Sequence, residues 1–257
     1  VLANLTIVGS GNTTKNQNWT FSVRVFDGTE WSEWANSSVL TIENSAPTQS
    51  SLTNPENNSY TNTTPITMNW TASNDTNLDT VNYYVMVNGT QACYTNDLNC
   101  SYIPSSEAYY EWNITAFDGT ENGTSSNSRF YTYDITKPII TNITHGSVTS
   151  SGAALILITN ENANCAYNDT NSSVEYASMT AFSTTGGTTS HSTSLTGLSA
   201  STSYTYYVRC VDAAGNVMNF SNSTTFTTSA VLTSSGGGGG GGTPTASYEQ
   251  KSFGTLA

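Results

Sequence analysis

Apolar and polar residues alternate with a period of two along three stretches of the chain, which lie within residues 19–29, 110–120 and 204–214. Successive side chains of a β-strand point to opposite faces of the sheet, so this alternation predicts three strands, each with one buried face. An Asp-Gly or Ala-Gly pair ends each alternating run, which indicates that each strand continues into a hairpin turn. The residues predicted to point inward are Trp19, Phe21, Val23 and Val25; Tyr110, Trp112, Ile114 and Ala116; and Tyr204, Tyr206, Val208 and Cys210.

The three strands belong to one internal repeat. Asp27, Asp118 and Asp212 occupy its matching position, and they are 91 and 94 residues apart. A repeat of this length is the size of one seven-stranded β-sandwich. The fold class predicted for the chain is therefore all-β, with tandem antiparallel β-sandwich domains.

Prolines mark the boundaries of the repeat. Pro47 and Pro138 cannot donate a ladder hydrogen bond, so each suits the start of a first strand. Residues 47–136 and 137–228 are expected to be complete sandwiches, and residues 1–46 to hold the last three strands of another. The remaining strands of that truncated domain would come either from missing upstream sequence or from a neighbouring molecule.

The C-terminal part has a different composition. Residues 229–246 are rich in Gly, Ser and Thr and include seven consecutive glycines, which predicts a flexible linker. Residues 247–257 are expected to begin a further, truncated region.

Further strands are predicted inside the two complete domains. Residues 67–72 and 81–87 are expected to be the second and third strands of the earlier domain, with Trp70 in its core. In the later domain the second strand is expected at residues 153–158, and Cys165 lies on the third.

Small polar residues dominate the composition, with 36 Ser, 44 Thr and 29 Asn among 257 residues. Only 9% of the residues are charged, and the formal net charge is −12. Nucleic acids and anionic membranes attract basic surfaces, and this chain has 6 Lys and Arg in total. No apolar run approaches the roughly 18–20 residues that span a bilayer. We therefore expect neither a nucleic-acid partner nor a membrane span in this sequence.

Acceptor sites for N-glycosylation are unusually frequent. The chain has 17 Asn-x-Ser/Thr sites, whereas chance placement of its Ser and Thr around 29 asparagines gives about 9. In four of them the middle residue is a large apolar one within a predicted strand, which turns Asn and Thr towards solvent. These observations predict an extracellular, cell-surface glycoprotein. The acceptors are Asn4, Asn12, Asn18, Asn36, Asn57, Asn62, Asn69, Asn74, Asn88, Asn99, Asn113, Asn122, Asn142, Asn168, Asn171, Asn219 and Asn222.

Four cysteines agree with an oxidising compartment. None has the Cys-x-x-Cys spacing of a zinc or redox site, and four cysteines allow three pairings. Pairing within domains selects Cys93 with Cys100 and Cys165 with Cys210. The alternative is four free, buried thiols in a reducing compartment.

Catalytic residues are scarce. His145 and His191 are the histidines of the chain, and no nucleophile elbow surrounds either of them. Both are expected at the surface, and we do not expect an enzyme or an organic cofactor. The acidic loop 74–79 is a calcium candidate, because oxygen ligands suit Ca²⁺. Asp75, Asp79 and Asp118 would be its ligands, and the alternative is an ordinary Asx-rich turn.

Residues 195–204 read Leu-Thr-Gly-Leu-Ser-Ala-Ser-Thr-Ser-Tyr and resemble the signature of the fibronectin type III fold. The resemblance implies a tyrosine corner, in which the Tyr204 hydroxyl bonds to backbone in the preceding loop. The earlier domain and the N-terminal part resemble bacterial and archaeal immunoglobulin-like repeats. Residues 234–253 are similar to the linker and opening of a C-terminal region of archaeal surface proteins.

The most unusual exposed motif is Trp31-Ser32-Glu33-Trp34. It is similar to the Trp-Ser-x-Trp-Ser motif of cytokine-receptor fibronectin domains, although Ala35 replaces the final Ser. That resemblance implies that Arg24, on the preceding strand, inserts between the two indoles. The motif is then either a structural ladder that covers the sheet or a platform for a sugar or protein ligand.

Together these patterns predict a non-catalytic structural module of a secreted, N-glycosylated cell-surface protein, such as a stalk, surface-layer or filament component. Its partners would be neighbouring domains or subunits of the cell envelope. One alternative is an adhesion module that binds carbohydrate or protein. Another is a set of spacer domains of an exported hydrolase.

Overall fold

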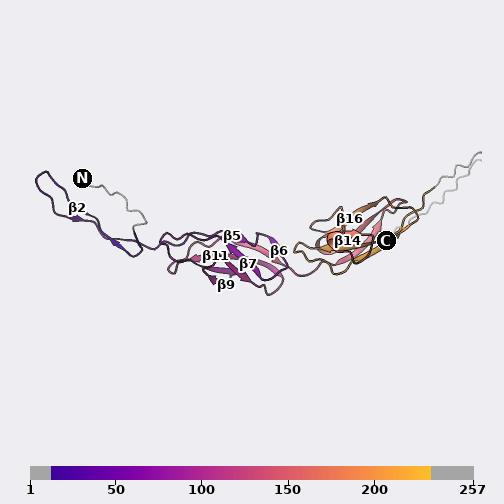
Figure 1. Ribbon diagram of the computed structural model, residues 1–257, viewed down its shortest axis with the longest axis horizontal. Helices are drawn as coiled ribbons and strands as arrows, with labels where there is room; N and C mark the ends of the chain where they lie inside the picture. Colours follow the sequence, from indigo (N-terminus) through magenta and orange to yellow (C-terminus); the bar gives the residue numbers. More distant parts are fainter. Residues whose placement is uncertain (1–12, 233–257) are drawn as a thin grey trace, which may run out of the picture.

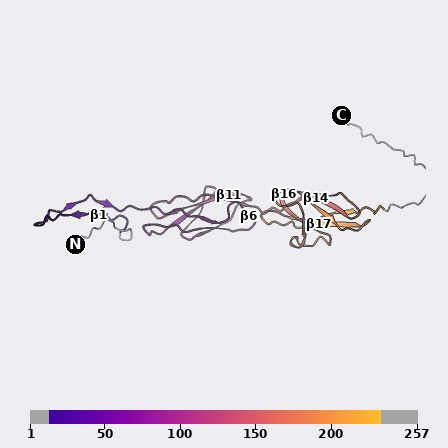
Figure 2. The ribbon, with the colours of Figure 1, turned by 90° about the horizontal axis from the view of Figure 1, so that it is seen from above.

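The computed structural model describes residues 13–232, and its regular structure in that range is almost entirely β. Three parts follow one another in a row: an N-terminal hairpin with strands between residues 18 and 41, a first sandwich with strands between 52 and 133, and a second sandwich with strands between 140 and 227 (Figure 1). The view turned by 90° shows the same elongated arrangement (Figure 2). The predicted region 247–257 and all but the first residues of the predicted linker 229–246 lie outside the described residues.

Four short strands form the N-terminal hairpin. They pair antiparallel, β1 with β4 and β2 with β3, and an isolated bridge joins Phe26 to Trp31. At the tip of the hairpin Asp27 Oδ1 accepts the backbone N–H groups of Thr29 and Glu30, which closes the turn. The strands are β1 Asn18–Trp19, β2 Ser22–Val23, β3 Ala35–Asn36 and β4 Leu40–Thr41.

The apolar face of this hairpin is exposed. Phe21, Val23 and Val25 keep 51%, 62% and 67% of their surface accessible, whereas Trp112 and Ile114 at matching positions of the repeat keep 0% and 1%. In the first sandwich a second sheet covers that face, and within residues 13–232 no such sheet covers the hairpin. A two-stranded ribbon alone leaves its apolar side chains without packing partners.

The first sandwich consists of a three-stranded and a five-stranded sheet. Their strand orders are β10-β7-β5 and β6-β12-β11-β8-β9, and all pairs are antiparallel except β6 with β12. The strands are β5 Leu52–Asn54, β6 Ser59–Thr61, β7 Ile66–Trp70, β8 Asn82–Val87, β9 Thr90–Thr95, β10 Asn99–Tyr102, β11 Ala108–Phe117 and β12 Arg129–Tyr133.

Alternating side chains from the two sheets build the core of the first sandwich. Trp70 on β7 and Trp112 on β11 are 4% and 0% exposed and belong to one buried cluster with Met68, Val85 and Tyr131. The Trp70 ring also meets the edge of Tyr83, with ring centroids 5.5 Å apart. Trp112 on the repeated strand therefore packs into the core as the alternation predicts, and Trp70 on β7 lies in the same core.

The second sandwich is organised around one long strand, β14. Near its start β14 pairs with β13 and β16, and from Asn164 to Asn168 it pairs with β17. The register shifts between Ile158 and Ala163, where the strand passes from one layer to the other. The elements are β13 Ile140–Gly146, β14 Gly152–Asn168, the 3₁₀ turn η2 Tyr176–Ser178, β15 Thr180–Ala181, β16 Thr188–Thr196, β17 Ser203–Val211 and β18 Asn222–Thr227.

This long strand corrects one expectation from the sequence. Residues 153–158 and the segment around Cys165 were expected to be separate second and third strands, but they are the two halves of β14. The polar residues between them keep extended backbone while the pairing partners change, so no turn interrupts the strand. As the resemblance implies, the Tyr204 hydroxyl accepts a hydrogen bond from the backbone N–H of Ser199 at 2.9 Å.

Candidate functional site

Two disulfides stabilise the sandwiches, one in each. Cys93 on β9 bonds to Cys100 on β10, and these strands lie in different sheets, so the bond joins the layers of the first sandwich. Cys165 on β14 bonds to Cys210, which is its direct partner on β17. None of the four cysteines, all of which lie in the described residues, is free. The described chain thus has both of the pairings that the domain boundaries predict, and the alternative of free thiols does not apply.

The Arg24 guanidinium lies between two indole rings on the N-terminal hairpin. Its central carbon is 4.4 Å from the ring centroid of Trp31 and 4.8 Å from that of Trp34. Trp31 also contacts Phe26, with ring centroids 5.0 Å apart. Both indoles remain about half exposed, at 44% and 57%. This tryptophan ladder (Arg24, Trp31 and Trp34) is therefore ordered by cation–π contacts and still presents aromatic surface to solvent.

Polar contacts join the N-terminal hairpin to the first sandwich. Lys15 Nζ lies 2.5 Å from Asp79 Oδ2, and Asn44 Nδ2 donates to Asp118 Oδ2 at 2.7 Å. The backbone N–H of Ser45 donates to Asn77 Oδ1 at 2.7 Å. We call this region the first junction. The hydrogen bond and the charge of Asp79 raise the pKa of Lys15, whose ammonium group is also near two further carboxylates.

The calcium candidates Asp75, Asp79 and Asp118 meet at this first junction, with carboxylate oxygens that lie within 4.8 Å of one another. Burial alone would raise the pKa of Asp118. Hydrogen bonds from Asn44 and from the backbone N–H groups of Glu121 and Thr120 overcome that effect and hold the pKa below its ordinary value. The fold therefore gathers three residues that the sequence associated only by loop position.

A second junction, between the two sandwiches, has its own acidic cluster. Carboxylate oxygens of Asp134, Glu161 and Asp212 also lie within 4.8 Å of one another. Burial, and then the neighbouring carboxylates, raise the pKa values of Asp134 and Glu161. Asn216 Nδ2 donates to Asp212 Oδ2 and to the backbone carbonyl of Asp134, which ties the sandwiches together.

The second cluster was not predicted from the sequence. Asp212 occupies the same position of the repeat as Asp118, so the repeat could have pointed to this one residue of the cluster. Asp134 lies in the segment that connects β12 to β13, and Glu161 lies where β14 changes its pairing partners, so a linear pattern does not encode their proximity.

The acceptor asparagines lie at the surface. Asn4 and Asn12 are outside the described residues, and none of the other 15 is buried. Local contacts distinguish two of them. Asn62 Nδ2 donates to Asn216 Oδ1 at 3.0 Å across the second junction, and Asn168 Nδ2 is enclosed without a hydrogen-bond partner.

His191 corrects another expectation, because it is fully buried rather than at the surface. Its Nε2 lies 3.1 Å from Thr159 Oγ1 and its Nδ1 lies 3.3 Å from Thr185 Oγ1. Thr159 Oγ1 already donates to the Glu161 carbonyl, so it accepts from Nε2–H, and Thr185 donates to Nδ1. Burial lowers the pKa of His191. A neutral ring with both nitrogens occupied is a structural residue and not a free base.

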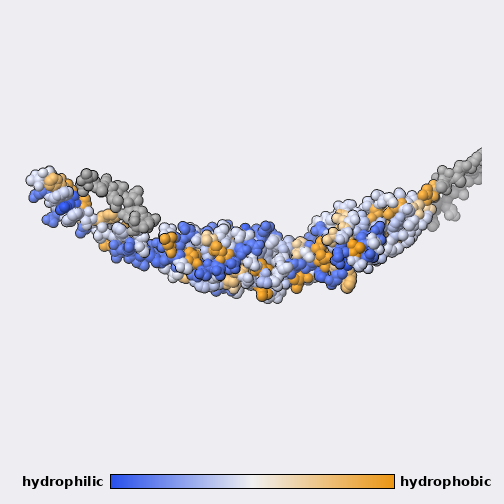
Figure 3. Space-filling view, in the orientation of Figure 1, coloured by the Kyte–Doolittle hydropathy of each residue, from blue (hydrophilic) through white to orange (hydrophobic). Residues whose placement is uncertain are grey.

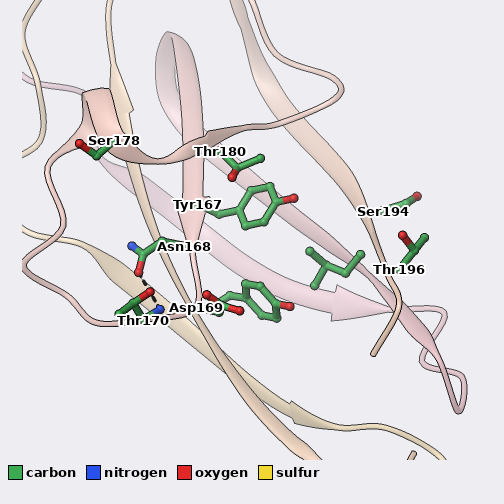
Figure 4. A pocket seen from close by; sticks show the side chains of 10 residues that line it. Tyr167, Asn168, Asp169, Thr170, Ser178, Thr180, Ser194 and Thr196 are labelled. Carbon is green, nitrogen blue, oxygen red and sulfur yellow. Dashed lines mark hydrogen bonds between the residues drawn. The ribbon is translucent and has the colours of Figure 1, made fainter. Parts of the chain in front are cut away.

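A shallow pocket of about 410 Å³ lies beside the C-terminal half of β14 (Figure 4). Asp169 is the acidic residue of its lining, and neither described histidine contributes to it. Asn168 Oδ1 accepts the backbone N–H of Thr170 at 2.9 Å, as drawn in Figure 4. The lining offers hydroxyl and carboxylate groups for hydrogen bonding without a paired base and nucleophile. It consists of Tyr167, Asn168, Asp169, Thr170, Ser178, Thr180, Ser194, Leu195, Thr196 and Tyr206.

The face of the sandwiches seen in Figure 3 is mostly polar, with small apolar patches between polar residues. Among residues 13–232, no helix has the length and apolar character needed to traverse a bilayer.

No protein-family model matches the sequence, and no curated protein matches it. Several solved structures align with it over much of its length. The chicken CNTN1 FN1–FN3 domains share 14% identity, with 84% of this chain and 77% of that chain covered and a TM-score of 0.46. The fibronectin(III)-like modules of Clostridium thermocellum CbhA share 10%, with 72% and 96% covered and a TM-score of 0.44. The central fibronectin-III array of RIM-binding protein shares 15%, with 73% and 70% covered and a TM-score of 0.28.

Proposed function

We propose that the chain is a non-catalytic, rod-forming module of a secreted and N-glycosylated cell-surface protein. In this role the sandwiches act as spacers in a stalk, surface layer or filament. Disulfides and sheet ladders maintain the shape, and sugars hydrate a surface that has few charges. The module contacts neighbouring domains or subunits of the envelope.

The observation that carries this proposal is the placement of the acceptor asparagines. None of the 15 described acceptor asparagines is buried. The number of acceptor sites in the sequence is nearly twice the number expected by chance. In β11 the sequence Asn113-Ile114-Thr115 buries only its middle residue, at 1% exposure. Apart from Asn168, whose Nδ2 is enclosed, acceptors outside the core permit sugar attachment without loss of packing, which is what a glycan-covered rod requires.

The junctions support a rod rather than loosely linked domains. Lys15 and Asn44 contact the first sandwich at the first junction, and Asn216 contacts both Asp134 and Asn62 at the second. Several hydrogen bonds at each junction restrict the angle between neighbouring parts, and the parts lie end to end in both views (Figures 1 and 2).

Glycopeptide mass spectrometry on material secreted from a glycosylating host tests the first half of the proposal, and small-angle X-ray scattering tests the second. We expect sugar on most acceptors and a maximum dimension that matches the end-to-end arrangement. The same protein made without glycosylation serves as the control and should keep the rod shape with lower solubility. Bare asparagines throughout would refute the glycoprotein role, and a compact particle would refute the rod.

A second candidate function rests on the tryptophan ladder. Two indoles that are about half exposed and held by one guanidinium form a rigid aromatic surface, and such surfaces stack on sugar rings or anchor protein partners. Trp31→Ala and Trp34→Ala should then reduce adhesion to glycan arrays or cells. Phe220→Ala removes an aromatic side chain that is 80% exposed on the second sandwich and is the matched control. Unchanged adhesion together with a lower melting temperature would identify the ladder as purely structural.

A further inference from the structure

The first junction concentrates negative charge. Asp75 and Asp79 come from the loop between β7 and β8, and Asp118 follows β11. Backbone N–H groups fix two of them: Asp75 Oδ1 accepts from Asn77 and Asp79, and Asp118 Oδ1 accepts from Thr120 and Glu121. The loops therefore hold these carboxylates close together despite their mutual repulsion.

The positive charge at this junction does not balance the cluster. Lys15 pairs with Asp79, and the other ion pair among residues 13–232 is Arg209 with Glu175, in the second sandwich. Three carboxylates and one ammonium leave two negative charges uncompensated. A single divalent cation would neutralise them.

Asp75 has a buried carboxylate oxygen that no hydrogen-bond donor contacts. Its side chain is 95% buried, since the residue is 5% exposed, and its Oδ2 atom is enclosed with no hydrogen-bond donor. A buried carboxylate oxygen without a partner is strongly unfavourable, because water cannot replace the missing interaction. The N–H groups of Asn77 and Asp79 are already used by Oδ1, so a partner for Oδ2 has to come from outside this stretch of loop backbone.

We propose that Asp75, Asp79 and Asp118 hold a calcium ion that fastens the N-terminal hairpin to the first sandwich. Calcium suits the cluster better than magnesium because it accepts oxygen ligands in irregular geometry, whereas magnesium demands a near-ideal octahedron and retains water. Lys15 then competes with the ion for Asp79. The inference goes beyond a spacer role, because it makes the first junction responsive to calcium in the surroundings. It does not depend on glycosylation.

Isothermal titration of Ca²⁺ into the full chain tests the site. We expect saturable binding with Kd of about 10⁻⁴–10⁻³ M, the range of extracellular modules. Asp75→Asn should weaken binding about tenfold or more, since it removes the charge with almost no change in shape. Asp97→Asn removes an exposed carboxylate from the loop between β9 and β10 and should leave Kd unchanged. Lys15→Gln should tighten binding severalfold, because it removes the competing ammonium.

Each outcome decides the proposal. Absent binding at millimolar Ca²⁺, or equal binding by wild type and Asp75→Asn, overturns it. Binding that survives Asp75→Asn but disappears in Asp134→Asn assigns the ion to the second junction and also overturns it. If circular dichroism shows that Asp75→Asn does not fold, the Lys15→Gln variant provides the test. A lower Kd for Ca²⁺ in this variant supports the site, and an unchanged Kd refutes it. These results do not depend on sugar occupancy, so they are separable from failure of the proposed function.

Discussion

Removal of the two disulfides should destabilise the two sandwiches to different extents. Cys165 and Cys210 are 45 residues apart, whereas Cys93 and Cys100 are 7 apart. A cross-link stabilises a protein mainly because it restricts the unfolded chain, and the restriction grows with the length of the closed loop. The loop-entropy relation gives about 4 kcal/mol for the bond in the second sandwich and about 2.4 kcal/mol for that in the first.

The tryptophans make the two domains separately observable. All five lie at or before residue 112, so the second sandwich has none. Urea unfolding followed by tryptophan emission reports the first sandwich and the hairpin, while far-UV circular dichroism reports both sandwiches. For Cys165→Ala/Cys210→Ala we expect an unchanged emission transition and an early additional transition in the dichroism. For Cys93→Ala/Cys100→Ala the emission transition itself should move to lower urea.

The order of the two effects is the decisive result. If the Cys93–Cys100 variant loses as much free energy of unfolding as the Cys165–Cys210 variant, loop length does not govern these bonds. If removal of Cys165–Cys210 shifts the tryptophan transition, the sandwiches do not unfold independently, and the separate cores are not separate cooperative units.

Three further results are expected. Burial lowers the pKa of His191, whereas the unfolded chain keeps the ordinary value of 6.5. The unfolding free energy of the second sandwich should therefore have its maximum contribution from His191 above pH 6.5 and should fall as the pH decreases below it. Urea midpoints at about pH 7.5 and about pH 5 measure this change, and His191→Gln should reduce it. Tyr204→Phe should lower the unfolding free energy by about 1 kcal/mol, because it removes the acceptor of the Ser199 N–H hydrogen bond. Tyr167→Phe removes a hydroxyl in the same way and is the control. Equal decreases of the unfolding free energy for the two variants in urea melts would contradict a tyrosine corner. Glycopeptide analysis should find less sugar on Asn168, whose Nδ2 is enclosed, than on its exposed neighbour Asn171, and higher occupancy at Asn168 would show that attachment precedes folding.

The pattern of side chains along the chain is enough to predict the local β-structure and which face of each strand is apolar. Alternation in residues 110–120 correctly assigned Trp112 and Ile114 to the core, because a strand has a side-chain period of two whatever surrounds it. The same pattern in residues 19–29 assigned Phe21 and Val23 to an inward face, yet these side chains are exposed. A pattern specifies which face is apolar, and burial additionally needs a second sheet to cover it.

The way in which strands and loops combine depends on tertiary contacts. The passage of β14 between layers, the burial of His191 and the meeting of Asp134, Glu161 and Asp212 all depend on contacts between distant segments. The physical reason is that side-chain periodicity is a local property, whereas the choice of pairing partner depends on the shape and charge of surfaces that only the folded chain brings together.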